Sequence, residues 1–589
     1  MSQTGATLPV RCVQVADVLQ PLGLLRPELE VLAPTHQSYR ALLFQPSGPI
    51  YADAQRIGHW LGGNGVTRCE SFLRLAAARG NQLVVVPEYC MPVDTLEECI
   101  VAGVFPDERA VWVLGCESLT PAALEQFKQR TAAHCTVVHE PLQGPAVQGT
   151  YYDAVAYCFV TTDLEGHSRR VVIFQFKTGP SRDPHFLENE HLKVGSIIYQ
   201  FRNADDLFGF SAIICSDAFT LQDRDLCRKL TDRATLVHIQ LNPNPRHVDY
   251  RQYRAETFSR PLTFSNCDIV CLNWAQKVDQ YDNDGGPVAW PNIGGSAWYL
   301  PSDRCSTQDQ EILRNDSRGL YYAFLDKRRH VLLFHYDEAV FELTVPKIAI
   351  LGAAVQGNTI GPVANTRFVW DSGSATWAQD DNVPDAGLTD LLAQDGLVAA
   401  AFAPLVAIGN RLSIERAIAL SCGQAELHES WHVVGKLEAC QMKPDEVVYR
   451  TTFCMDPCVE ARTARHDRVQ QVAALHHVLT HETLPIQVRD VGGPGVAITW
   501  VRAAPHMNVV KQGCLPALVA FLGSQPLPER IRGVADGLLE LLRRENKPHQ
   551  KRVAVCYRKA DGTMEFAAMP ALTRIDHDGG SLANITTVL

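Results

Sequence analysis

Residues 212–219 read Ala-Ile-Ile-Cys-Ser-Asp-Ala-Phe, an apolar run that ends at Cys215 and is followed at once by small and polar residues. This pattern predicts a buried strand that ends in a sharp turn and presents the thiol of Cys215 at that turn. A nucleophile is well placed there, because the strand is rigid and the next backbone N–H, that of Ser216, can face a developing oxyanion. The chain has 18 cysteines, and most cysteines in proteins are small buried hydrophobic residues. A catalytic role for Cys215 therefore needs support from other parts of the chain.

Two further strands are predicted to end in a charged side chain. Residues 83–89 (Leu-Val-Val-Val-Pro-Glu-Tyr) bring Glu88 to a strand end, and residues 171–180 bring Lys177 to a point just before a turn. One mechanism needs all three groups, namely a base for the thiol, a cation for the oxyanion and the nucleophile Cys215. The alternative is three unrelated strand ends, with Lys177 as a structural ion-pair partner of Glu88.

Three short motifs carry a resemblance to a known family: Val86-Pro87-Glu88, Phe176-Lys177-Thr178 and Ile214-Cys215-Ser216-Asp217-Ala218-Phe219. Their order, the strands before them and the gaps between them resemble the nitrilase, or carbon–nitrogen hydrolase, superfamily. Each motif alone is weak evidence, and the three in register are strong evidence. The resemblance covers residues 38–346. It implies an α/β fold in which two half-sandwiches pair into a four-layer αββα assembly, and a homo-oligomer that forms through this domain.

The resemblance also implies a chemistry, which is hydrolysis of a C–N bond in a small non-peptide amide or nitrile. Glu88 takes the proton of Cys215, and the thiolate attacks the amide or nitrile carbon. Lys177 and the backbone N–H of Ser216 stabilise the tetrahedral oxyanion. Ammonia or an amine leaves, and Glu88 activates the water that hydrolyses the thioester. We expect no cofactor and no metal ion in this mechanism.

The family commonly has a second carboxylate between its lysine and its cysteine. Glu188 matches that position by its spacing to Gly195, and Glu190 is the competing candidate. A surface role stays open for either glutamate. Asp217 lies two residues after the cysteine, as in the family, and is expected to hold the turn.

Length and composition restrict the remaining choices. A chain of 589 residues is expected to form two domains or more, because single cores stop growing at roughly 250–300 residues. The net charge of −11 does not indicate binding to nucleic acid, although a local basic patch stays open. No apolar run approaches the roughly 18 residues of a membrane helix, and the first residues lack the pattern of a signal peptide. So many cysteines in a long chain predict a cytoplasmic protein in a reducing compartment.

The pattern along the chain predicts four segments. Residues 1–37 are an N-terminal extension without an assigned role, and residues 38–346 are the nitrilase-like domain with alternating strands and helices. Residues 347–385 are rich in glycine and aspartate and are expected to be a linker or irregular region. Residues 386–589 are predicted to form a separate mixed α/β domain of unknown role.

The second half contains one motif with possible metal chemistry. His428-Glu429-Ser430-Trp431-His432 spells HExxH, which on a helix places two imidazoles on one face for zinc. No strand signal precedes it, and solvated or core histidines are the simpler interpretation. The pair Cys454 and Cys458 has no partner pair at a convincing spacing and is read as structural. The second half also lacks a Ser-Gly-Gly loop of the ATP-pyrophosphatase type, which argues against the architecture of glutamine-dependent NAD synthetase.

Three function classes therefore follow from the sequence. The first is a cytoplasmic thiol hydrolase with an appended domain. The second is a nitrilase-fold binding or regulatory module of a bacterial multidomain system, which includes antiviral systems. The third is a zinc metalloprotease in the second half. The intact set of Glu88, Lys177 and Cys215 favours the hydrolase, because a repurposed pocket usually loses the glutamate or the cysteine.

Overall fold

The computed structural model describes residues 9–33, 38–53, 56–60, 63–142, 150–181, 188–243, 248–260, 267–275, 278–281, 288–290, 294–301, 309–326, 329–346, 348–351, 354–357, 361–381, 383, 388, 392–393, 396–424, 451–452, 459–545 and 549–569. These residues divide into two compact units. The first contains the described residues up to Val383, and the second contains those after it.

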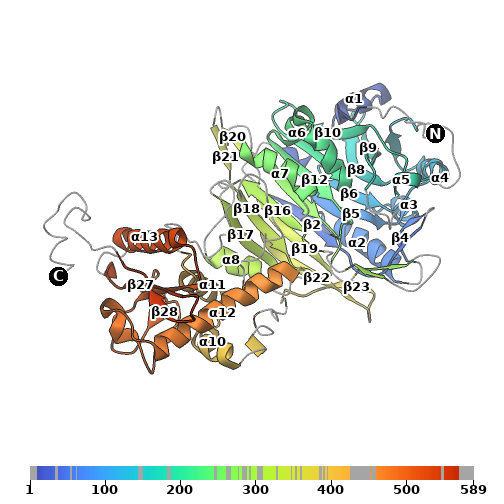
Figure 1. Ribbon diagram of the computed structural model, residues 1–589. Coiled ribbons are helices and arrows are strands. Elements are labelled where there is room, and N and C mark those ends of the chain that lie inside the picture. Colours follow the sequence, from blue (N-terminus) through green and yellow to red (C-terminus); the bar gives the residue numbers. More distant parts are fainter. Residues whose placement is uncertain are drawn as a thin grey trace, which may run out of the picture. The chain divides into compact units, whose positions relative to one another are not determined.

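Two large β-sheets, each with parallel and antiparallel pairs, form the centre of the first unit (Figure 1). Within the described residues, one sheet has eight strands in the order β1 (Arg11–Gln14), β10 (Ile197–Arg202), β11 (Gly209–Ile214), β12 (Ala234–Ile239), β13 (Cys267–Leu272), β16 (Ala297–Pro301), β18 (Arg329–Phe334) and β17 (Leu320–Asp326). The other, counted in the same way, has nine strands in the order β23 (Thr376–Gln379), β22 (Val363–Asp371), β19 (Ala339–Pro346), β2 (Ser38–Gln45), β5 (Leu83–Met91), β6 (Val111–Cys116), β8 (Ala154–Thr162), β9 (Ser168–Phe176) and β7 (Thr136–His139).

The two large sheets pack face to face, and buried polar side chains link them. The hydroxyl of Tyr157 in β8 accepts a hydrogen bond from the backbone N–H of Ala212 in β11 at 2.9 Å. Gln175 in β9 donates to the carbonyl oxygen of Ala212, also at 2.9 Å, and its own oxygen accepts from the N–H of Tyr199 in β10. Because these groups satisfy one another out of contact with water, they fix the position of β11 against β8 and β9.

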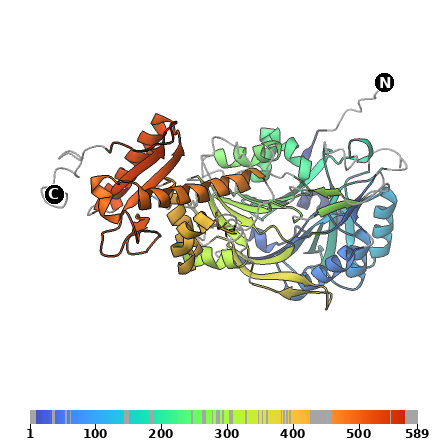
Figure 2. The same ribbon diagram turned by 60° about the horizontal axis from the view of Figure 1, so that its bottom comes forward.

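Helices cover the outer faces of the two sheets (Figures 1 and 2). On the nine-stranded sheet, α2 buries Cys69, Phe72, Leu73 and Ala76, which recur at helical spacing and pack into one core with β2, β5 and β6. On the eight-stranded sheet, α6 packs on β11 and β12. The helices described in this unit are α1 (Val15–Leu19), α2 (Gly65–Arg79), α3 (Val93–Val101), α4 (Pro121–Thr131), α5 (Glu188–His191), α6 (Arg224–Thr231), α7 (Val248–Ser259) and α8 (Asp309–Ser317). The α/β class predicted from the sequence is confirmed.

Smaller elements complete the first unit. One further sheet has the order β15 (Val288–Trp290), β14 (Val278–Tyr281), β3 (Ile50–Ala52) and β4 (Ile57–His59), and β20 (Ile348–Leu351) pairs with β21 (Ala354–Gly357). Short 3₁₀ helices cover Gln20–Leu22, Glu30–Leu32 and Cys215–Gln222.

Two segments differ from their sequence-based description. Residues within the predicted N-terminal extension form β1, which pairs in parallel with β10. Residues within the predicted linker form β22 and β23, and β22 pairs with β19. Both segments lie at or near a sheet edge, where a strand needs neither great length nor a continuous apolar run. The glycines between 352 and 361 suggested an irregular region, but Ala354–Gly357 pairs with Ile348–Leu351, and pairing continues from Val363.

The second unit is built on a three-stranded sheet of β26 (Leu518–Ser524), β27 (Val553–Arg558) and β28 (Met564–Phe566). Alternate residues of β26 enter two different cores, with Val519 and Phe521 in one and Leu518 and Ala520 in the other. The first core contains residues of α10 (Gly396–Ile408), α11 (Arg411–Ser421) and α12 (Val459–His481), and the second contains residues of α13 (Pro528–Glu545). The remaining elements are a 3₁₀ helix at Ile486–Val491 and the pair β24 (Ala497–Ile498) and β25 (Val509–Val510).

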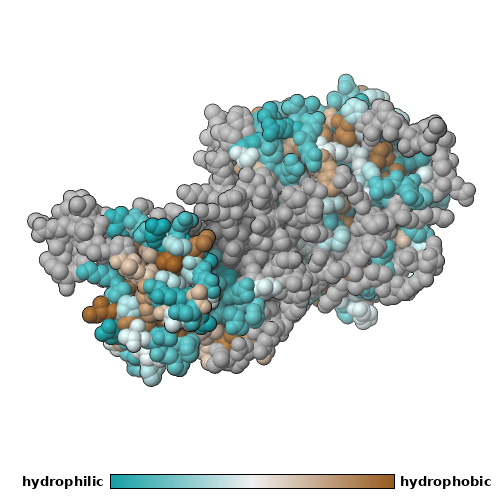
Figure 3. All heavy atoms as spheres, viewed as in Figure 1, coloured by the Kyte–Doolittle hydropathy of each residue, from teal (hydrophilic) through white to brown (hydrophobic). Residues whose placement is uncertain are grey.

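Most coloured residues on the viewed face are hydrophilic, with separate hydrophobic spots (Figure 3). In the parts of the chain that the structure describes, no helix combines the length and the apolar character needed to cross a membrane.

Candidate active site

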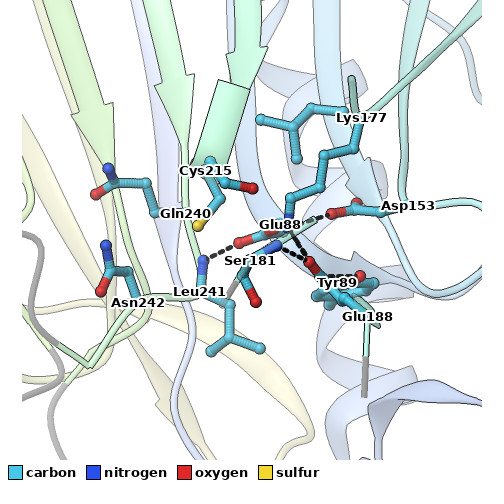
Figure 4. A network of polar contacts seen from close by, with 12 residues as sticks. Glu88, Tyr89, Asp153, Lys177, Ser181, Glu188, Cys215, Gln240, Leu241 and Asn242 are labelled. Atoms are coloured by element: carbon cyan, nitrogen blue, oxygen red, sulfur yellow. Dashed lines mark hydrogen bonds and ion pairs between the residues drawn. The ribbon is translucent and has the colours of Figure 1, made fainter. Parts of the chain in front are cut away.

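The three residues singled out by the sequence lie close together between the two large sheets (Figure 4). Glu88 lies in β5, Lys177 directly follows β9, and Cys215 directly follows β11. The ammonium nitrogen of Lys177 is 2.7 Å from Oε1 of Glu88, and the sulfur of Cys215 points toward the Glu88 carboxylate. The exposed fractions are 1% for Glu88, 0% for Lys177 and 3% for Cys215. Glu88 does not end its strand as predicted, because β5 continues to Met91, although its pairing with β6 is irregular between Val86 and Met91. Three positions that are far apart in the sequence thus meet in one buried cluster.

The backbone is strained at two positions of this cluster. Cys215 has φ +38° and Tyr89, next to Glu88, has φ +56°. Residues with a Cβ rarely adopt positive φ, and such strain concentrates at functional sites, where surrounding contacts hold it. At Cys215 the sharp change of direction ends β11 and begins the 3₁₀ helix Cys215–Gln222.

Hydrogen bonds tie the turn after the cysteine to the segment after the lysine. Asp217 accepts from the N–H of Ile214 at 2.9 Å and from both the N–H and the hydroxyl of Thr178 at 2.7 Å. The hydroxyl of Ser216 donates to the carbonyl oxygen of Gly179 at 2.6 Å. Burial raises the pKa of Asp217 to about 6, although these hydrogen bonds oppose the shift. Asp217 therefore holds the turn, and it fixes the nucleophile candidate relative to the cation.

A histidine that sequence reasoning missed supports the backbone of the cysteine. Nε2 of His238, in β12, lies 2.9 Å from the carbonyl oxygen of Cys215, and Nδ1 lies 2.7 Å from the hydroxyl of Tyr253. Burial, followed by the charge of Arg254, lowers the pKa of His238 to about 3, so its ring is neutral. The hydroxyl of Tyr250 lies 3.8 Å from the sulfur of Cys215. One signal was available, because His238 is a polar residue inside an apolar strand.

Three carboxylates surround Lys177. Its ammonium nitrogen lies 2.7 Å from Glu88, 2.8 Å and 2.9 Å from the two oxygens of Glu188, and 3.3 Å from Asp153. Sequence reasoning missed Asp153. It directly precedes β8, which pairs with β9 so that Ala154 lies opposite Phe176, and this register brings Asp153 next to Lys177. The sequence shows that Asp153 directly precedes an apolar run, but it does not show in which register that strand pairs with β9.

The charges in this group follow from burial and proximity. Burial lowers the pKa of Lys177, but Glu188, Glu88 and Asp153 outweigh it and raise this pKa well above its usual range. Burial raises the pKa of Glu188, but Lys177 outweighs it and lowers this pKa overall. Burial and the Glu88 carboxylate raise the pKa of Asp153 well above its usual range. At neutral pH, Lys177 is therefore a cation and Glu188 an anion, while the shift in the pKa of Asp153 favours its protonated form.

The structure distinguishes the two candidates for a further carboxylate. Glu188 is buried, accepts from the hydroxyl of Tyr89 at 2.6 Å and accepts from the N–H of Ser181 at 2.5 Å. The side chain of Glu190 is 76% exposed and lies 3.8 Å from His191. Only Glu188 therefore contacts the cluster around Lys177.

Glu88 is held at both of its side-chain oxygens. Oε1 accepts from Lys177, and Oε2 accepts from the backbone N–H of Leu241 at 2.5 Å. The indole of Trp274 donates to the Glu88 carbonyl oxygen at 2.8 Å. Each carboxylate oxygen has two lone-pair sites, so Glu88 keeps capacity to accept a proton from Cys215.

The cysteine is a neutral thiol in this environment. Burial and the Glu88 carboxylate raise the pKa of Cys215 well above its usual range, and Lys177 opposes this shift. A thiol of this kind needs a base at the moment of attack, and the Glu88 carboxylate faces it.

The second half of the chain contains further features of interest. The HExxH sequence at His428–His432 and the cysteines Cys454 and Cys458 lie outside the described residues. The second unit has a cavity of about 650 Å³, whose lining includes Asp467, His476, His477, His481 and Arg558.

No protein-family model matches the sequence, and no curated protein matches it. Among the solved structures, the chain is similar to the glutamine-dependent NAD+ synthetase from Acinetobacter baumannii in complex with adenosine diphosphate, at 14% sequence identity and a TM-score of 0.26. That match covers 68% of this chain and 58% of the synthetase chain, which is less than two thirds of the latter.

Proposed function

We propose that the first unit is a nitrilase-like thiol hydrolase that acts on the C–N bond of a small non-peptide amide or nitrile. One observation carries the proposal: a charged lysine and a glutamate, 2.7 Å apart, are buried together beside a cysteine on a strained strand end. The order of the three motifs along the chain and the helix, sheet, sheet, helix layering of the unit support the resemblance to the nitrilase superfamily.

The first half of the proposed reaction forms a thioester. Glu88 accepts the thiol proton of Cys215 as the sulfur bonds to the carbonyl carbon of an amide, and the carbonyl oxygen becomes an oxyanion. Lys177 and the backbone N–H of Ser216 stabilise that oxyanion. The C–N bond then breaks, Glu88 returns its proton to the leaving nitrogen, and ammonia or an amine departs.

The second half hydrolyses the thioester. Glu88 accepts a proton from water, the hydroxide oxygen bonds to the acyl carbon, and the same cation and N–H stabilise the second oxyanion. The C–S bond breaks, Cys215 regains a proton, and the carboxylic acid departs.

Glu188 and Asp153, the two further acids beside Lys177, influence the charges that the proposed reaction uses. Glu188 is an anion that keeps Lys177 protonated, and it contacts Lys177 on two oxygens. Burial and the Glu88 carboxylate raise the pKa of Asp153 and favour its protonated form, which limits the negative charge beside Glu88.

Release of ammonia from a library of small amides and nitriles tests the proposal. The wild-type chain should release ammonia from at least one compound, and Cys215→Ala should release none. Glu190→Gln, which changes an exposed carboxylate near the site, serves as the matched control and should keep wild-type turnover. Hydrolysis by Cys215→Ala at the wild-type rate would rule out the thiol mechanism.

A further inference from the structure

A second cluster of reactive side chains lies in the first unit, apart from the residues of the proposed active site. It consists of His59 at the end of β4, Cys69 in α2 and Cys90 in β5, with exposed fractions of 3%, 0% and 0%. The sulfur of Cys69 lies 3.5 Å from Nε2 of His59 and 3.9 Å from the sulfur of Cys90, and the Cys90 sulfur lies 3.7 Å from the same Nε2. Three segments of the chain thus place two sulfurs and one imidazole nitrogen at the corners of a triangle.

The distances between these three atoms match the distances between ligand atoms around a tetrahedrally coordinated zinc ion. With Zn–S bonds of about 2.3 Å and a Zn–N bond of about 2.0–2.1 Å, tetrahedral angles place two sulfurs roughly 3.8 Å apart and a sulfur and a nitrogen roughly 3.6 Å apart. The observed separations are 3.9 Å for the two sulfurs, and 3.5 Å and 3.7 Å for the two sulfur–nitrogen pairs. A disulfide would need the sulfurs about 2.05 Å apart, so the cysteines are reduced thiols at metal-ligand spacing.

Packing fixes the histidine so that Nε2 faces the sulfurs. A Cβ placed on Gly65 would lie 2.2 Å from Nδ1 of His59, so the backbone of α2 lies directly against the other side of the ring. The ring also packs on Trp274, with the centroids 5.1 Å apart. Because the ring cannot turn freely, the ligand geometry exists before any ion binds.

We propose that His59, Cys69 and Cys90 bind Zn²⁺. Two cysteines and one histidine are a ligand set that zinc prefers, and each thiol releases its proton to the solvent when it binds the ion. The fourth position falls to water or to the carbonyl oxygen of Cys90, which lies 3.4 Å from the Cys69 sulfur. No metal was predicted at this place from the sequence. The three ligands come from separate elements and match no compact spacing motif.

The zinc would support the proposed active site without taking part in its chemistry. Cys90 lies two residues after Glu88 in β5, and Trp274 contacts both the His59 ring and the carbonyl oxygen of Glu88. The ion would therefore fix the end of β5 against β4 and α2. The site is buried, so zinc should enter during folding and exchange slowly afterwards.

Metal analysis of the full-length chain, purified under reducing conditions and dialysed against EDTA, tests this proposal. The wild-type chain should retain one zinc per chain, and Cys69→Ser, Cys90→Ser and His59→Ala should each lose it. Cys99→Ser, at another buried cysteine nearby, Cys215→Ala and His428→Ala should keep it. Loss of zinc only in His428→Ala would assign the ion to the HExxH sequence and overturn the proposal.

X-ray absorption of the zinc-bound wild-type chain identifies the ligand atoms of the zinc directly. This measurement needs no variant, so it tests the proposal even where a variant fails to fold. The expected spectrum has two sulfur neighbours at about 2.3 Å and nitrogen or oxygen neighbours at about 2.0–2.1 Å. Cobalt(II) taken up in place of zinc should show thiolate charge-transfer bands and the intense visible bands of tetrahedral cobalt. Absence of zinc from the wild-type chain, a zinc shell without sulfur, or a Cys69–Cys90 disulfide in peptides from the reduced preparation would each overturn the proposal.

Discussion

At the scale of single residues, the site depends on one buried cation. Lys177 lies within 3.3 Å of three carboxyl groups. Its charge outweighs burial and lowers the pKa of Glu188, whereas burial and Glu88 raise the pKa of Asp153. The sequence indicated the lysine as an oxyanion partner or as an ion-pair partner of Glu88. The structure shows the ion pair, and the proposed reaction uses the same ammonium for the oxyanion, so the two roles are compatible.

Replacement of Lys177 by alanine should impair both turnover and stability. Loss of one oxyanion donor typically lowers the rate by ~10²–10³-fold. Removal of one member of a buried ion pair also leaves unpaired charge, which typically lowers the free energy of unfolding by about 3–5 kcal/mol. Turnover assays and urea unfolding measure the two effects. Near-normal turnover in a folded Lys177→Ala variant would contradict the oxyanion role.

Glu188 and Glu190 allow the same substitution at a buried and at an exposed glutamate. Glu188→Gln removes a buried partner of Lys177 and should lower the free energy of unfolding by about 1–3 kcal/mol at pH 7. The folded-state pKa of Glu188 is lowered, so its contribution is present above its unfolded pKa and is lost as pH falls through the folded value. The stability gap between wild type and Glu188→Gln should therefore shrink on acidification.

Glu190→Gln is the control for that comparison. Its side chain is 76% exposed, so the substitution should change stability by less than about 0.5 kcal/mol at any pH. Urea titrations of the three proteins at pH 7 and pH 4 provide the measurement. Equal losses in the two variants would show that burial of Glu188 does not matter to the fold.

At the scale of elements, the sequence located where two of the three strands end but not which strands pair. The apolar runs that stop before Lys177 and at Cys215 were readable, because local pattern indicates where a buried strand stops, whereas β5 continues past Glu88 to Met91. Asp153 and His238 were missed, because their importance depends on which strands pair and in what register. Local pattern also did not decide which of Glu188 and Glu190 belongs to the site. The two residues lie two positions apart on the short helix α5, so their local sequence is nearly the same.

A glycine beside β5 allows the position of Glu88 to be tested through the backbone. A Cβ at Gly115 in β6 would lie 2.1 Å from the carbonyl oxygen of Pro87 and 2.7 Å from the N–H nitrogen of Glu88. Backbone atoms cannot rotate away as a side chain can, so Gly115→Ala should displace Glu88 and lower the free energy of unfolding by about 1–3 kcal/mol. Thermal unfolding and turnover assays record both effects.

Gly179 provides the comparison for that substitution. A Cβ there meets no atom within 4 Å, although the residue lies near the same cluster. Gly179→Ala should therefore leave the melting temperature close to that of wild type. A drop in Gly179→Ala as large as that in Gly115→Ala would mean that the close approach of β6 to Glu88 is not the cause.

At the scale of the whole molecule, the division into two units predicts where the chain can be cut. A fragment of residues 1–383 keeps β22 and β23, which extend the nine-stranded sheet beyond β19. A fragment of residues 1–346 exposes the edge of β19, whose Val340, Phe341, Leu343 and Val345 are buried in the full chain. Exposed apolar edge strands promote aggregation, so the longer fragment should be monodisperse and cooperative in unfolding, and the shorter one should aggregate. Size-exclusion chromatography of both fragments gives the answer, and a well-behaved 1–346 fragment would contradict the sheet assignment.

In the proposed reaction Cys215 carries a covalent acyl group, and acid-quench mass spectrometry can detect this group on the protein. The full-length chain is mixed with amides and nitriles from which it releases ammonia, quenched in acid and digested. For an amide substrate, the peptide that contains Cys215 should be heavier by the mass of the amide minus ammonia, and the Cys215→Ala chain should carry no adduct. Release of ammonia with the acyl group on another residue, or at an undiminished rate in Cys215→Ala, would contradict it.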